Sequence, residues 1–213
     1  MRVPSELAAG SQRFDVRGWL GPWSGKLRFG PYVADRAKLS WQKSSSSGAT
    51  LSDGRREVTE SRRSGHFQFH APNAGRIGAS CSVERRTTLM QAQRLKLIGM
   101  RWEDKVETAE QIETFRCQFE RAAASPFELL VELGREGHAS VDGVAITIDM
   151  VSENSHQPFP TVETRVGFLL AEAGRQVAAV DLNHAWSVTL RNDLASPRRD
   201  EIAAIAASLL MLR

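Results

Sequence analysis

Two histidines, His66 and His70, stand four positions apart in a segment with strand-like alternation, and imidazole is a common metal ligand. On a strand, residues four apart are separated by about 13 Å, because each residue adds about 3.3 Å. The two rings therefore cannot share one zinc ion, whose ligands lie about 2.0–2.3 Å from the metal. The other histidines, His138, His156 and His184, are dispersed, and neither C-x-x-C nor H-E-x-x-H occurs. The sequence predicts no metal site and no other cofactor.

Acid–base or nucleophilic catalysis needs a hydrogen-bonded group of side chains, such as a histidine beside a carboxylate. The sequence holds no G-x-S-x-G elbow, no G-x-x-x-x-G-K-[ST] phosphate loop and no G-x-G-x-x-G fingerprint. Asp181 and His184 are close enough in sequence to form a pair, and His138 is a third candidate. An enzyme whose site is assembled from these distant residues is one hypothesis. We favour a non-catalytic protein, because every catalytic motif tested is missing.

Four arginines, Arg55, Arg56, Arg62 and Arg63, lie in the polar, serine-rich segment 44–64. Its low complexity predicts a flexible loop. Acidic residues are interleaved with the arginines, so the simplest interpretation is a solvated loop. The alternative is a site for an anionic ligand such as lipid head groups. No aromatic residue stands among the arginines to stack on bases, so nucleic acid is not an expected partner.

The two cysteines, Cys81 and Cys117, fall on apolar faces of two predicted strands. If these strands are neighbours, or face each other across the core, a disulfide can form, and it would indicate an oxidising compartment. Two buried free thiols are the equally good alternative.

The composition fits one domain with a substantial core: 213 residues, 41% hydrophobic and 25% charged, with a formal net charge of +3. That small excess of positive charge is weak evidence for an acidic partner. The start, MRVPSELAAG, lacks the apolar run of a signal peptide, and no stretch is long enough to span a bilayer. We therefore expect a cytoplasmic protein. A periplasmic or membrane-attached location is the alternative if this is a processed mature chain.

Alternation of apolar and polar residues recurs along most of the chain and predicts many short strands. Phe67 and Phe69, for example, alternate with histidine and glutamine, and glycine-containing turns separate such runs. Residues 103–124 fit either a strand or a helix. The two-residue period through Phe115 and Phe119 favours the strand.

The chain ends in an apolar segment that predicts a buried helix over residues 196–213. Pro197 suits the first helical position, and we expect Ser196 to cap the helix and Asp200 and Glu201 to lie in its first turn. Between residues 202 and 212, Ser208 is the single polar residue. A helix that is apolar all round is buried on all sides or lies in a membrane, and this run is short for a span.

The C-terminal third has a familiar order: Gly167-Phe168 in a strand, a turn at Gly174, Ala178-Ala179-Val180 in the next strand, one more strand, and the apolar helix. This order is similar to the end of tubby-like proteins of the LURP-one and phospholipid-scramblase type. The resemblance implies a closed β-barrel with the helix inside it, which removes exposed sheet edges. The chain has no recognisable calcium-binding acidic segment and no cysteine-rich region, so scramblase activity is not implied.

The sequence therefore predicts a mainly β (α+β) protein with a single domain over residues 1–213. Its expected architecture is an antiparallel β-barrel, or a strongly curled sheet, packed around a buried C-terminal hydrophobic helix. The expected function is a non-catalytic binding or structural module that acts at anionic lipid surfaces or with a protein partner. The enzyme assembled from His138, Asp181 and His184 is the alternative.

Overall fold

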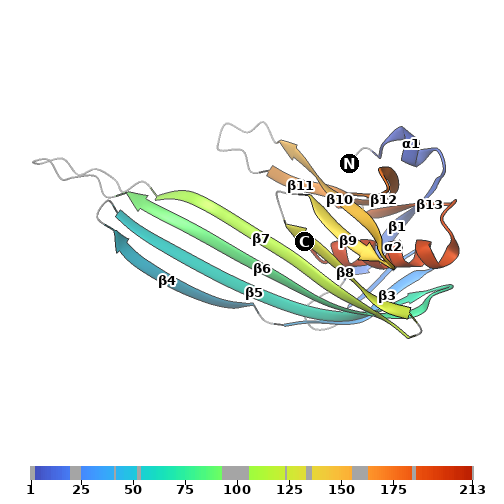
Figure 1. Ribbon diagram of the computed structural model, residues 1–213, viewed down its shortest axis with the longest axis horizontal. Helices are drawn as coiled ribbons and strands as arrows, with labels where there is room; N and C mark the ends of the chain where they lie inside the picture. Colours follow the sequence, from blue (N-terminus) through green and yellow to red (C-terminus); the bar gives the residue numbers. More distant parts are fainter. Residues whose placement is uncertain are drawn as a thin grey trace, which may run out of the picture.

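The computed structural model describes residues 3–19, 25–40, 42–51, 54–92, 106–122, 124–132, 136–154, 163–183 and 186–212. Thirteen strands and two helices lie within these ranges (Figure 1). In chain order they are α1 (Ser5–Ala8), β1 (Ser11–Trp19), β2 (Lys26–Phe29), β3 (Tyr32–Leu39), β4 (Lys43–Leu51), β5 (Gly54–Ala71), β6 (Gly75–Ala92), β7 (Val106–Arg121), β8 (Ala124–Glu132), β9 (Gly137–Val141), β10 (Val144–Asn154), β11 (Glu163–Glu172), β12 (Arg175–Asp181), β13 (Ser187–Arg191) and α2 (Ser196–Leu209).

Twelve of the strands close into an antiparallel barrel. Their order is β3-β2-β1-β13-β12-β11-β10-β9-β8-β7-β6-β5, and pairing of β3 with β5 completes the ring. Most neighbours in the barrel are also neighbours in sequence, and two-residue turns join β2 to β3, β9 to β10 and β11 to β12. At the β9–β10 turn, Asp142 and Gly143 both have positive φ (51° and 78°), as a two-residue hairpin turn of the favoured type requires. The prediction of a β-barrel around a C-terminal helix is confirmed.

The barrel interior takes the apolar residue of each alternating pair. Phe67, Phe69 and Phe119 are at most 1% exposed, and their immediate neighbours along each strand are exposed or half-buried. Phe168 on β11 is also fully buried. Closure gives every wall strand two hydrogen-bonded neighbours, so the wall has no free edge along these pairings. On the outside, α1 packs on β12 and buries Leu7 completely.

Helix α2 fills the barrel. Its residues 202–207 are 0% exposed, and Ser208 satisfies its buried hydroxyl by donating to the carbonyl of Ile205 (2.7 Å). The expected cap is wrong: the N-cap residue is Ala195, and no side chain caps the helix. Because α2 begins at Ser196, Asp200 and Glu201 lie beyond the first turn, and both carboxylates bond to the barrel instead.

The segment 44–64 is not a flexible loop. It forms β4 and the first half of β5, which pair antiparallel from Lys43 with Arg62 to Leu51 with Gly54. This ladder satisfies the backbone hydrogen bonds of a strand whose side chains are exposed, so polarity alone did not distinguish it from a loop.

Three of the wall strands are much longer than the barrel. β5 and β6 have 18 residues each and β7 has 16, and their outer parts run past the barrel side by side with β4 (Figure 1). We call this four-stranded sheet the extension: β4 with residues 54–64, 83–92 and 106–115. The ambiguous region 103–124 therefore contains a strand, as its two-residue period indicated.

Candidate functional site

The four arginines of the candidate anion site do not form one cluster. Arg56 and Arg62 are six positions apart on one face of β5 and are exposed, whereas Arg63 is on the opposite face and is partly buried. Arg62 pairs with Glu84 at 3.3 Å. Arg55 is in register between Thr50 and Gln91, and its side chain lies outside the described residues.

Two of the candidate catalytic residues, His138 and Asp181, are not brought together. Asp181 is 7% exposed at the end of β12, and His138 is exposed on β9. Two strands separate β9 from β12, so three strand spacings, about 14 Å, lie between their backbones. His184 lies outside the described residues. Across the described ranges, no group of three or more His, Cys, Asp or Glu side chains is arranged to hold a metal ion.

The two cysteines are directly opposite each other on β6 and β7. Cys81 and Cys117 form a disulfide, with Cα atoms 4.1 Å apart and exposures of 6% and 0%. Neighbouring strands, the first of the two arrangements expected from the sequence, thus bring them together.

A different group of cations gathers on the outer wall of the barrel. Strands β1, β2 and β3 are adjacent, and their outward positions carry a set of exposed basic side chains that we call the basic face. The basic face consists of Arg13, Arg17, Lys26, Arg28, Arg36 and Lys38. Buried residues such as Phe14, Leu27 and Ala37 alternate with these cations, so the strand period that builds the core also aims the cations at solvent.

The charge on the basic face is not neutralised. Within the part of the chain that the structure describes, none of its six cations has an ion pair or a side-chain hydrogen bond. Arg17 is directly opposite Arg28, an arrangement of like charges that destabilises a sheet. The strands contribute two acidic residues, Asp15 and Asp35, and Asp35 bonds to His70 Nε2 at 3.2 Å.

Several arginines elsewhere, on strands β7 and β13 and on helix α2, are paired with carboxylates. Arg121 contacts Asp142 and Glu201, Arg198 contacts Glu172 and Glu201, and Arg191 contacts Asp193. The barrel therefore holds several arginines in ion pairs and leaves those of the basic face without partners. The signal was present in the sequence, since the basic residues of RFDVRG and KLRF alternate with apolar ones. The arginines of residues 44–64 are more closely spaced in sequence, so the sequence prediction placed the anion site there.

The buried charges at the N-terminal end of α2 bind the barrel together. Asp200, which is 1% exposed, accepts hydrogen bonds from the backbone N–H groups of Asn73 and Ala74, both at 2.8 Å. Burial, followed by the negative charge of Asp200, raises the pKa of Tyr32 to about 12. Glu201 pairs with Arg121 and Arg198. Because these groups are satisfied by one another, we assign them to stability rather than to chemistry.

Comparisons with protein-family models, curated proteins and solved structures gave no match. No helix in the described ranges is both long enough and apolar enough to cross a membrane. The geometry of the basic face therefore carries the functional interpretation by itself.

Proposed function

We propose that the protein is a non-catalytic binding module that docks on anionic lipid surfaces through its basic face. The observation that carries this proposal is the direct opposition of Arg17 and Arg28, with no counter-ion on either side chain within the described residues. A layer of lipid phosphates or carboxylates would supply the missing negative charge. The basic residues lie on hydrogen-bonded wall strands, so binding costs little backbone conformational entropy.

The expected strength follows from the number of cations. Each lysine or arginine near an anionic membrane surface contributes about 1 kcal/mol, and the interaction decays within a Debye length of about 8–10 Å. Six cations set against two aspartates favour binding that is reversible and sensitive to salt. No aromatic side chain described on this face could stack on bases, which favours lipid over nucleic acid.

The same architecture supports kinship with the tubby-like barrels. A helix inside a closed antiparallel barrel is the arrangement that the C-terminal resemblance implied, and the order of β11, β12, β13 and α2 agrees with it. A solved structure of a tubby-like protein whose strand order differs from this ring would remove that support.

The test is co-sedimentation with phosphatidylcholine vesicles that contain or lack phosphatidylserine. We expect binding only with phosphatidylserine, and we expect added salt to release the protein. The double variant R17Q/R28Q should bind about 30-fold more weakly, because two contributions of about 1 kcal/mol are lost. R56Q/R116Q makes the same change in net charge at exposed sites outside the basic face and should bind nearly as well as the unaltered protein.

Failure to bind anionic vesicles would end the lipid proposal and leave a protein partner as the remaining interpretation. Equal losses in the two double variants would show that net charge, and not this face, is responsible.

A further inference from the structure

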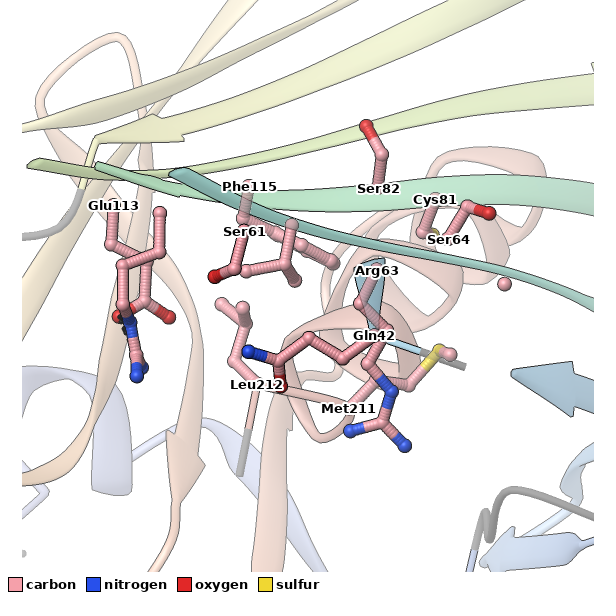
Figure 2. A pocket seen from close by; sticks show the side chains of 13 residues that line it. Gln42, Ser61, Arg63, Ser64, Cys81, Ser82, Glu113, Phe115, Met211 and Leu212 are labelled. Carbon is pink, nitrogen blue, oxygen red and sulfur yellow. Dashed lines mark hydrogen bonds and ion pairs between the residues drawn. The ribbon is translucent and has the colours of Figure 1, made fainter. Parts of the chain in front are cut away.

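A pocket of ≈ 120 Å³ lies where the extension leaves the barrel (Figure 2). It lies between the inner faces of β5, β6 and β7 and the residues that follow α2, and it is partly open to solvent. Phe115, Met211 and Leu212 provide apolar walls, and Arg63, Arg85 and Glu113 provide charged groups. In Figure 2, Glu113 lies on one side of the pocket and Arg63 on the other, with Leu212 between them.

The pocket carries one uncompensated positive charge. Arg85 donates to Glu113 Oε2 from Nε (3.2 Å) and Nη2 (2.9 Å), so these two groups neutralise each other. Arg63 is partly buried and has no ion pair or side-chain hydrogen bond with any described residue. Its guanidinium offers a pair of parallel donors that match a carboxylate.

The apolar part of the pocket favours an organic anion over an inorganic one. Phe115 is 1% exposed and Leu212 is 7% exposed, so a ligand group beside them would be shielded from water. A volume of ≈ 120 Å³ is several times the roughly 10–15 Å³ that admits a single water, so it has room for a short hydrocarbon segment. Phosphate or sulfate would fill similar space but would leave these side chains without apolar contact.

We propose that this pocket binds an aliphatic carboxylate, with the carboxylate on Arg63 and the hydrocarbon chain against Phe115, Met211 and Leu212. This site is separate from the basic face, because it opens on the inner side of β5–β7 whereas the basic face is on the outer side of β1–β3. The ligand is either a short acid held entirely in the pocket or a longer fatty acid whose tail extends out of it.

The test is calorimetric titration with sodium acetate, butanoate, hexanoate and octanoate at constant ionic strength. Affinity should rise about fourfold for each methylene group that enters the pocket. A plateau at butanoate or hexanoate identifies a short acid, and a continued rise to octanoate identifies a longer one. Inorganic phosphate lacks the hydrocarbon chain and hexanol lacks the carboxylate, so each should bind at least tenfold more weakly than hexanoate.

Two neighbouring arginines provide a matched pair of variants. R63Q should weaken hexanoate binding by about tenfold to a hundredfold, as expected for loss of hydrogen bonds to a charged group. R62Q removes the same charge one residue away on the opposite face of β5 and should leave the affinity unchanged. M211A should reduce the gain between butanoate and octanoate without affecting acetate.

Absence of hexanoate binding, equal loss in R63Q and R62Q, or an affinity that does not depend on chain length would overturn the proposal. The vesicle experiment is independent of this one. R17Q/R28Q should retain full carboxylate binding, so failure of one proposal is distinguishable from failure of the other.

Discussion

The barrel and the extension are built from the same three strands, yet they are stabilised in different ways. Inside the barrel, the inward positions of β5–β7 hold Phe67, Phe69 and Phe119, all at most 1% exposed. In the extension, the inward positions of the same strands also carry polar groups, among them Arg85 and Glu113, which pair with each other. The outward face carries the exposed pairs Arg62–Glu84 and Arg86–Glu60. Backbone pairing continues through both regions with one irregularity, beside Leu89.

The difference shows that hydrogen-bond ladders set the shape of this sheet and apolar burial sets its stability. Exposed ion pairs contribute about 0–1 kcal/mol each, whereas full burial of a large apolar side chain contributes about 1.5–3 kcal/mol. We therefore expect the barrel to unfold as one cooperative unit around α2 and the extension to tolerate substitution.

The largest expected effect is the contrast between two isoleucines. Ile205 on α2 is 0% exposed, so I205A should lower the free energy of unfolding by about 2–5 kcal/mol through lost burial and a residual cavity. Ile112 in the extension is 42% exposed, and I112A should change the free energy of unfolding by less than about 0.5 kcal/mol. Urea unfolding followed by circular dichroism measures both. Similar losses in the two variants would mean that the extension belongs to the cooperative core.

A smaller effect should follow from removing the buried carboxylate that joins α2 to the β5–β6 turn. D200A removes the acceptor of the Asn73 and Ala74 N–H groups, and loss of hydrogen bonds to a charged group costs about 1.5–3 kcal/mol. The same urea titration measures the loss, and D193A, at an exposed aspartate, is the control. If D193A were as damaging as D200A, the barrel would not depend on its internal polar contacts as described.

The smallest effect concerns alkaline pH. Tyr32 is the single tyrosine of the chain, and its pKa is raised from 10 to about 12. Because the folded state holds this proton more tightly than the unfolded state, the stabilisation is complete below pH 10 and is lost as pH rises through about 12. The loss should reach about 1 kcal/mol near pH 11.

The phenolate absorbance band reports the titration of Tyr32 directly. The difference in pH dependence between the unaltered protein and Y32F isolates its contribution from that of the lysines. A tyrosine that ionises near pH 10 in the folded protein would show that this part of the barrel is open to water.

The barrel was predictable because its residues follow simple periods. Phe67 and Phe69 alternate with polar neighbours, and the run after Glu201 is apolar on nearly all sides, so a sheet curled around a helix was the consistent solution. The helix cap was not predictable in this way. Ser196 is the preferred residue type at such a position, but Ala195 is the N-cap. Asp200 binds the β5–β6 turn and Glu201 binds Arg121 on the wall, contacts that the local sequence does not reveal.

The polar strands and the sites were harder to infer. In residues 44–64 no apolar period marks a strand, because neither face of β4 is buried, and the pairing that orders it is invisible in the local sequence. The opposition of Arg17 and Arg28, and the placement of Arg63 beside Leu212, depend on strand register and on contacts across the chain.

The unbroken course of β5 and β6 has a mechanical consequence. Eighteen residues of strand reach about 60 Å, and each of these strands stays hydrogen-bonded to its neighbours inside the barrel and beyond it. No hinge interrupts them where β5 exchanges its partner β3 for β4. We therefore expect the described part of the extension to move together with the barrel, so that a force applied to its outer end is transmitted along the paired strands to the barrel wall.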